Sequence, residues 1–132
     1  MAQTLPHHPC PCGSLHEFAE CCEPYLNGTQ SAPTPEALMR SRYTAYVLEN
    51  VTYLLNSWHP ETRPKTLEFD PEVRWLGLKI VKVHRGVHEN TGHVHFVARY
   101  KVKNGQAHRL EENSRFEKVG TQWFYVDGDF SE

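Results

Sequence analysis

All four cysteines of this 132-residue chain lie within one stretch, CPCGSLHEFAECC, which runs from Cys10 to Cys22. The stretch holds two close pairs of thiols, C-x-C and C-C, separated by eight residues. Two such pairs, joined by a segment that reverses the chain, can place four sulfur atoms at the corners of a tetrahedron, the geometry of structural zinc sites. A segment this short has too few apolar groups to hold that shape alone, so we expect the metal to order it.

The residues between the two pairs suit a reversal of the chain. Pro11 stiffens the first pair, and Gly13 with Ser14 permits a sharp turn after it. The following LHEFAE can form about one helical turn that returns Cys21 and Cys22 to the ion. Cysteine then fills every corner, so no position remains for water or substrate, and the predicted site is structural rather than catalytic. The predicted zinc ligands are Cys10, Cys12, Cys21 and Cys22.

Other interpretations of the cluster stay open. Adjacent cysteines bridge each other poorly, and disulfide frameworks suit secreted chains. An iron–sulfur cluster also uses four cysteines, but its usual spacings are C-x₂-C or C-x₄-C. His7, His8 and His16 lie near enough in sequence to compete as ligands, although they are interpreted more simply as solvated loop residues.

Composition restricts the class of protein. The 14 Lys and Arg residues nearly balance the 16 Asp and Glu residues, so there is no basic excess for bulk nucleic-acid binding. The start, MAQTLPHHPC, lacks the cationic and apolar regions of a secretory signal, and no apolar run approaches the ~18 residues of a membrane span. We expect a cytoplasmic protein with reduced thiols that binds neither nucleic acid nor membranes.

The cysteine stretch resembles the SEC-C motif, the zinc module named after the C-terminus of the SecA translocation ATPase. The resemblance implies a metal-ligand role for the four cysteines and an adaptor surface for a protein partner. Members of the family usually carry lysines between the cysteine pairs, whereas LHEFAE has two glutamates and no lysine. Binding to acidic protein surfaces, anionic lipid or ribosomal RNA is therefore not carried over to this chain.

A connector, NGTQSAPTPE, follows the cysteines and divides the chain into a zinc motif over residues 1–30 and a second domain over residues 31–132. We expect the zinc motif to fold apart from the second domain. Thr34 is a candidate N-cap for a helix over residues 36–50, whose apolar and aromatic face includes Leu48. Asn50 can cap a second short helix, VTYLLNSW, which ends before Pro60.

From Trp75 onward the apolar period changes from that of a helix to that of a strand. Alternation predicts strands over residues 74–86, 93–102, 107–119 and 122–130. The first strand places Leu76, Leu78 and Ile80 on one face. Helices followed by an antiparallel meander of four strands indicate an α+β fold, with the helices packed on one face of a curved sheet.

The layout resembles the nuclear transport factor 2-like (NTF2-like) fold, in which N-terminal helices and a curved antiparallel sheet form a cone. The segments LMRSRYTAYV, YLLNSWHPETR, ENSRF and WFYVDGDF resemble the YchJ-like proteins, a bacterial family with an N-terminal SEC-C motif. The resemblance spans nearly the whole chain and implies a fold and a metal, but no established reaction. Some members carry a second cysteine motif at the C-terminus; this chain ends in DGDFSE, so a second zinc is not expected.

A cone of this kind usually leaves a concave cavity at its open end. Strand alternation places Glu112 on the same side as Phe116, and the predicted helix mixes Arg42 with apolar residues. An arginine on an apolar stripe either extends to solvent or binds an anion. Trp58, at a helix end, can line the cavity mouth. We therefore predict that Arg42, Trp58 and Glu112 contact a small polar or anionic ligand.

Each of these residues also has a structural interpretation. Glu112 can form a partly buried ion pair with one of three arginines, Arg40, Arg42 or Arg63. Trp58 can pack in the core while His59 caps the last helical turn.

Two functions from different classes follow. One is a zinc-binding adaptor or ligand-binding protein with a structural zinc. The other is a small enzyme that uses Glu112 as a general base, as in isomerases of this fold. The chain has no nucleophile elbow, phosphate loop or open metal site. We therefore assign no catalytic residue and prefer the first function.

Overall fold

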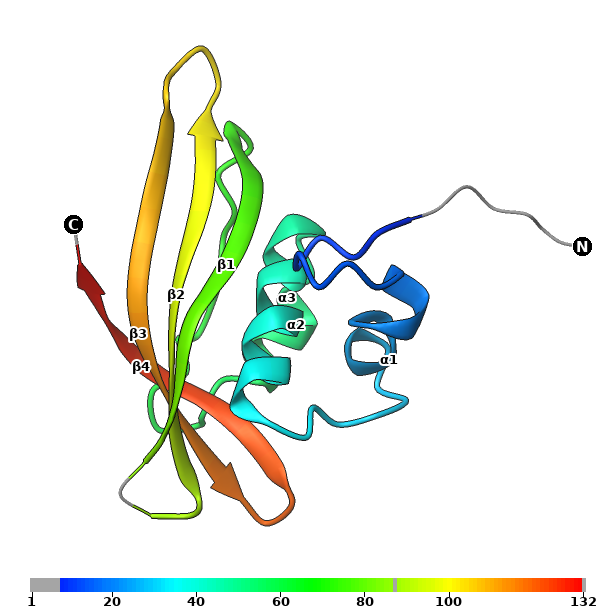
Figure 1. The fold of residues 1–132 in the computed structure, drawn as a ribbon, viewed down its shortest axis with the longest axis vertical. Helices are drawn as coiled ribbons and strands as arrows, with labels where there is room; N and C mark the ends of the chain where they lie inside the picture. The colour runs from blue at the N-terminus through cyan, green and yellow to red at the C-terminus, as the bar shows by residue number, and fades with distance from the viewer. Residues whose placement is uncertain (1–7, 87, 132) are drawn as a thin grey trace, which may run out of the picture.

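A four-stranded sheet, two central helices and an N-terminal segment make up the computed structural model, which describes residues 8–86 and 88–131 (Figure 1). The elements follow in the order η1 (Phe18–Glu20, a 3₁₀ turn), α1 (Glu23–Leu26), α2 (Pro35–Val47), α3 (Val51–Asn56), β1 (Val73–Arg85), β2 (Thr91–Val102), β3 (Ala107–Val119) and β4 (Gln122–Ser131). The strands form an antiparallel meander in the order β1-β2-β3-β4. The predicted α+β organisation, with helices before an antiparallel sheet, is confirmed.

Side-chain caps fix where the two central helices begin. The Thr34 hydroxyl accepts a hydrogen bond from the Ala37 amide at the start of α2, and the Asn50 amide oxygen accepts one from the Tyr53 amide at the start of α3. Both predicted caps are confirmed. The predicted apolar face of α2 extends too far, because α2 ends at Val47 and Leu48 follows as its C-cap, 51% exposed.

The core lies between α2 and one face of the sheet. Its buried side chains from the strands are Val94, Phe96, Ala98, Phe116 and Trp123, and those from α2 are Leu38, Met39 and Tyr43. In β1, irregular pairing between Trp75 and Gly77 shifts the alternation of side chains. Trp75 therefore packs against Tyr43, at 5.8 Å between ring centroids, whereas Leu76 is 45% exposed. The prediction that Leu76 shares a face with Leu78 and Ile80 is wrong for this reason.

The cysteine-bearing segment lies beside α2, and α1 contacts α2 directly (Figure 1). Tyr25 of α1 packs against the buried core, and Leu78 of β1 packs against the cysteines. α2 thus has the sheet on one side and the cysteine segment on another. No helix among the described residues is long and apolar enough to cross a bilayer.

Candidate functional site

The four cysteine sulfurs converge on one point. All four Sγ atoms lie within 4.8 Å of one another. The Sγ atoms of Cys12 and Cys21 are 3.6 Å apart and those of Cys21 and Cys22 are 4.0 Å apart. These separations exceed a disulfide bond of ~2.05 Å, and all four thiols are free. A tetrahedron with metal–sulfur distances of ~2.3 Å has edges of about 3.8 Å, so the four sulfurs fit a tetrahedral ion.

Backbone hydrogen bonds hold the segment that brings the sulfurs together. The Cys10 amide donates to the His16 carbonyl at 2.9 Å, and the Phe18 amide donates to the His8 carbonyl at 2.8 Å. Gly13, with a φ of 81°, makes the reversal between the two cysteine pairs. The 3₁₀ turn η1 then returns the chain, as the sequence predicts for LHEFAE.

Histidines contribute nothing to this cluster in the part of the chain that the structure describes. His8 and His16 are exposed and do not join the four sulfurs. His7 lies outside the described residues. The interpretation of His8 and His16 as solvated loop residues agrees with their exposure.

The protonation of the thiols shows what the cluster requires. Hydrogen bonds with Cys10 and Cys22 lower the pKa of Cys12 below its ordinary value, whereas hydrogen bonds with Cys10 and Cys12 raise the pKa of Cys22. Burial raises the pKa of Cys21 to about 11. Four thiols this close therefore do not ionise together unless a cation balances their charge.

A hollow of about 250 Å³ lies between α2, the segment after α3 and the sheet. All three predicted ligand residues, Arg42, Trp58 and Glu112, line it. Arg42 is only 2% exposed and Glu112 only 6% exposed. The remaining wall is mainly apolar and aromatic, with Met39 from α2 and Phe96 from β2. The fold thus brings together residues from three separate parts of the sequence.

Neutral groups surround the buried guanidinium of Arg42. Its Nη1 donates to the Leu54 carbonyl at 2.8 Å and to the Ser57 hydroxyl at 2.7 Å. Its central carbon lies 4.8 Å from the Trp58 ring centroid and 4.5 Å from that of Tyr125. Burial lowers the pKa of Arg42 from its ordinary value, yet a guanidinium remains charged at neutral pH. The charge is held by stacking and by neutral acceptors.

Hydroxyl groups surround the buried carboxylate of Glu112. Its Oε2 accepts hydrogen bonds from the Ser114 hydroxyl at 2.7 Å and from the Tyr125 hydroxyl at 2.8 Å. Burial, followed by the Glu112 charge, raises the pKa of Tyr125. Gly128 leaves room for the carboxylate, because a Cβ on Gly128 would lie 1.9 Å from Oε2.

No ion pair joins Glu112 to an arginine among the described residues. Arg40 instead pairs with Glu36 at 3.1 Å. Arg63 donates to the carbonyl of Trp58, at 2.7 Å from its Nη2. The direct ion pair proposed for Glu112 from the sequence is therefore absent among the described residues, although the Glu112 charge still acts on the buried Arg42. The hydrogen-bond partners of the carboxylate are neutral hydroxyls.

Trp58 lies in the cavity wall rather than wholly in the core. Its ring meets Tyr125 edge-on at 5.1 Å between centroids. Within the described residues its buried indole Nε1 has no hydrogen-bond partner. His59 does not cap the last helical turn as one interpretation predicts, because its amide donates to the Tyr125 carbonyl at 2.7 Å and its Nε2 lies 2.7 Å from a Glu117 oxygen.

Sequence reasoning missed three residues that shape this cavity: Ser57, Tyr125 and Gly128. Alternation along β4 carries a signal for Tyr125, since it lies two residues after the buried Trp123. Nothing local marks Ser57 or Gly128. Their roles depend on contacts with Arg42 and Glu112, which are distant in sequence.

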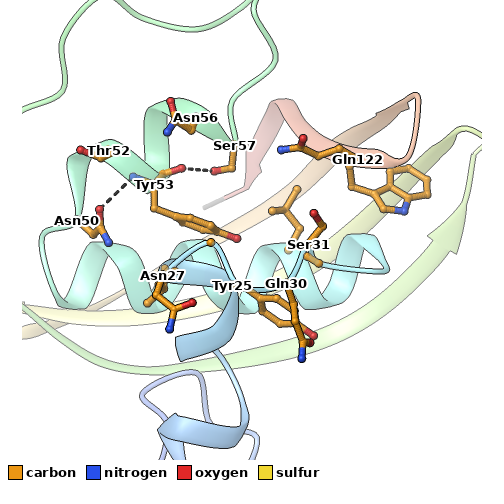
Figure 2. Close-up of a pocket in the computed structure, with 15 residues that line it drawn as sticks. Tyr25, Asn27, Gln30, Ser31, Asn50, Thr52, Tyr53, Asn56, Ser57 and Gln122 are labelled. Carbon is orange, nitrogen blue, oxygen red and sulfur yellow. Dashed lines mark hydrogen bonds between the residues drawn. The ribbon is translucent and has the colours of Figure 1, made fainter.

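A second hollow, of about 430 Å³, opens where the segment after α1 meets α3 and the β3–β4 turn (Figure 2). Every residue that lines it is uncharged, and none of the predicted site residues is among them. Tyr25 and Gln30 form one side, and Asn50 and Asn56 form the opposite side (Figure 2). The residues that directly follow the cysteine segment therefore share a surface with α3 and the start of β4.

These contacts weigh against the expectation that the zinc motif folds apart from the second domain, which stays a prediction. Tyr25 packs into the common core, and two side chains of α2, Arg40 and Thr44, form hydrogen bonds with cysteine atoms. The boundary between residues 30 and 31 stays a prediction, but independent folding of the two parts does not fit this packing.

Two protein families match consecutive parts of the chain. Residues 9–24 match the SEC-C motif, and residues 34–128 match the middle, NTF2-like domain of YchJ. Among similar proteins, a UPF0225 protein of Streptomyces coelicolor is 47% identical over 127 residues, covering 96% of this chain and 98% of its own. A UPF0225 protein of Deinococcus radiodurans is 44% identical over 122 residues, covering 92% of this chain and 89% of its own.

Solved structures of similar proteins share the architecture. The solution structure of a SEC-C motif containing protein from Rhodopseudomonas palustris has a TM-score of 0.81 at 34% identity, covering 93% of this chain and 98% of that protein. The crystal structure of a SEC-C motif containing protein from Psychrobacter arcticus has a TM-score of 0.73 at 27% identity, covering 96% of this chain and 83% of that protein.

Proposed function

This chain belongs to the YchJ family of SEC-C motif proteins, and we propose on that basis that it is a zinc protein whose NTF2-like domain binds a small polar or anionic ligand. The proposed zinc ligands are Cys10, Cys12, Cys21 and Cys22. The proposed ligand contacts are Arg42, Trp58 and Glu112. Zinc here stabilises the fold, and the cavity carries the function.

The donor set supports zinc as the ion. Four thiolates at tetrahedral spacing match structural zinc sites, which need no open position. Tetrahedral sulfur sites also suit iron, but the cysteine pairs here lack the usual spacing of iron–sulfur proteins. Three of the four sulfurs belong to buried residues, Cys10, Cys12 and Cys22, as suits a metal that is retained rather than exchanged.

The observation that carries the ligand proposal is that two opposite charges are buried in one cavity without a direct ion pair between them. Arg42 and Glu112 both line the hollow, and each has only neutral hydrogen-bond partners among the described residues. Burying an ion costs several kcal/mol in effective terms unless it is compensated. A ligand with complementary polar groups would compensate both residues, and an acceptor on it would satisfy the indole nitrogen of Trp58.

The walls limit the kind of ligand. Apart from these three residues, aromatic and aliphatic side chains such as Tyr43, Trp75 and Leu110 line a space of about 250 Å³. Ligand sites of this type combine apolar walls with a few polar groups that fix orientation. The proposed ligand is therefore a small organic molecule with an apolar body and one or more polar or anionic groups.

Mass spectrometry of the intact protein and of its denatured extract tests this proposal. We expect a small molecule that copurifies with the wild-type chain and with Arg99→Gln, a control at an exposed arginine. Arg42→Gln and Glu112→Gln should each lose it while still folding. If no small molecule copurifies and a library of small organic acids leaves the melting temperature unchanged, the ligand proposal fails.

The enzyme alternative keeps one supporting observation, since Glu112 faces a cavity beside the Tyr125 hydroxyl. The alternative predicts that Glu112→Gln retains the copurified molecule and no longer converts it, which separates it from simple binding.

A protein partner for the zinc motif is the remaining part of the proposal. Leu15, at the turn between the cysteine pairs, is 94% exposed, and we propose it as one contact of this partner. A photo-crosslinking amino acid at position 15 should yield one defined crosslinked partner in cells. The same amino acid at Thr52, which is also exposed, should not.

A further inference from the structure

Two polar side chains of α2 reach into the cysteine cluster. Arg40 Nη1 donates to the Cys12 carbonyl at 2.9 Å and lies 3.9 Å from the Cys12 sulfur. The Thr44 hydroxyl donates to the Cys22 sulfur at 3.4 Å and lies 3.7 Å from the Cys10 sulfur. Residues four apart share one face of a helix, so Arg40 and Thr44 form a single polar strip directed at the cluster.

The burial of Thr44 indicates that its hydroxyl serves as a hydrogen-bond donor to the cysteine sulfurs. Thr44 is fully buried, and among the described residues its hydroxyl has only the two sulfurs as side-chain hydrogen-bond partners. A buried hydroxyl without a partner is costly, so this position requires an acceptor. The cysteine sulfurs supply that acceptor, and they are best acceptors as thiolates.

Charge explains the position of Arg40. Four thiolates around a divalent ion leave a net charge of minus two, and a nearby cation reduces the cost of burying it. Arg40 is the arginine whose guanidinium contacts the cluster among the described residues. Its Nε is held by Glu36 at 3.1 Å, which leaves Nη1 directed at Cys12.

We propose that the metal site is composite: Arg40 and Thr44, which lie in the NTF2-like domain, are positioning residues that orient the cysteine ligands and set how tightly the metal is held. The proposal rests on metal binding by the four cysteines. It extends the site beyond residues 9–24, the stretch that matches the SEC-C motif. Outer-shell partners of this kind contribute about 10–100-fold to metal affinity.

The arrangement also gives α2 two separate tasks. Arg40 and Thr44 face the cysteines, whereas Arg42, between them in sequence, lines the cavity. One helix therefore positions the metal ligands on one side and the proposed ligand contacts on the other.

Competition between the zinc-loaded full-length protein and a colorimetric zinc chelator tests the proposal. Thr44→Val keeps the shape of the side chain and removes the donor, and Arg40→Met keeps the aliphatic stem and removes the charge. We expect each to weaken zinc binding about 10–100-fold. Thr44→Ser and Arg40→Lys should restore most of the affinity, and Thr52→Val and Arg99→Gln, at exposed positions, should match the wild type.

Cobalt substitution provides a second readout that packing alone would not change. The thiolate-to-cobalt charge-transfer band should shift in Thr44→Val, because the Cys22 sulfur loses a hydrogen bond, and should stay in place in Thr52→Val. If Thr44→Val or Arg40→Met fails to fold, Thr44→Ala or Arg40→Gln, which removes the same hydroxyl or the same charge, takes its place. In those variants a shifted cobalt band supports the proposal, and an unshifted band with wild-type affinity overturns it.

The outcomes distinguish a failure of metal binding from a failure of the composite site. A wild-type chain that holds no metal would refute metal binding itself. A wild-type chain that holds zinc, with Thr44→Val and Arg40→Met equally tight and spectroscopically unchanged, would refute only the composite site.

Discussion

The proposed metal centre and the cavity lie on different sides of α2 and are built in opposite ways. The metal centre takes all four candidate ligands from thirteen consecutive residues, Cys10 to Cys22, and helix α2 only supports them. The cavity draws Arg42, Trp58 and Glu112 from parts of the chain up to seventy residues apart. When the ligands of a site are close together in sequence, their spacing predicts the site. When the residues of a site are far apart in sequence, the site can be recognised only in the folded structure.

The two regions also handle buried charge differently. The cysteine cluster concentrates groups that need one cation and match its geometry. The cavity keeps opposite charges without a direct bond between them, each held by neutral partners. We therefore expect disruption of the metal centre to affect the whole fold and disruption of the cavity to affect mainly its own surroundings.

Removal of the metal should have the largest effect. Cys12→Ser, or chelation of the reduced protein, leaves the other thiols buried without a cation, so the cysteine segment should unfold from α2. We expect a loss of several kcal/mol, where each kcal/mol lowers the melting temperature by about 2–8 °C. Scanning calorimetry measures it. An unchanged melting temperature after complete removal of the metal would show that the ion does not hold the fold.

Truncation should come next. A chain that begins at Ser31 loses Tyr25 from the core and exposes Thr44, which is fully buried in the intact protein. The connector sequence alone predicts that this shorter chain still unfolds cooperatively, but the packing predicts a broad transition at lower temperature. Circular dichroism against temperature decides between them, and a sharp transition near that of the full chain would restore the two-module interpretation.

Gly128→Ala probes the cavity from behind the carboxylate. The new Cβ would lie 1.9 Å from Glu112 Oε2, so we expect a loss of about 1–3 kcal/mol in the free energy of unfolding. Urea denaturation measures the loss. In a Glu112→Ala background the same substitution should cost much less, because the clashing carboxylate is gone. Equal costs in the two backgrounds would place the carboxylate elsewhere.

The smallest effect should come from Glu112→Gln. The amide oxygen can still accept from Ser114 and Tyr125, so we expect a loss of only about 1 kcal/mol in the free energy of unfolding. Glu112 and Arg42 are not directly bonded but both contact Tyr125, so the losses in Glu112→Gln and Arg42→Gln should deviate from additivity by no more than about 1 kcal/mol in the double variant. Losses of about 3–5 kcal/mol in each single variant, without additivity, would indicate a structural ion pair.

Local patterns in the sequence predict the cysteine cluster, two helix starts and the inward face of one strand. Cysteine spacing predicts the cluster, Thr34 and Asn50 mark two helix starts, and alternation places Glu112 on the inward side with Phe116. Each of these signals depends on neighbours within a few residues along the chain. Residues that are close in sequence are also close in the folded protein, so local patterns can predict how they interact.

The predictions that are wrong concern features that depend on contacts between different elements of the fold. A bulge in β1 moves Leu76 outward, and the early end of α2 exposes Leu48; both depend on how elements meet their neighbours. Docking of the cysteine segment on Thr44 joins residues twenty-two positions apart. Contacts of this kind leave no periodic trace, so no pattern in the sequence predicts them.

The central claim is that four cysteines, supported by α2, form a closed metal site that the fold depends on. Elemental analysis combined with zinc-edge X-ray absorption, on protein purified without added metal, tests it most directly. We predict one zinc per chain with four sulfur ligands. Iron in place of zinc, fewer than four sulfur ligands, or a metal-free reduced protein that still unfolds cooperatively at the same temperature would contradict the claim.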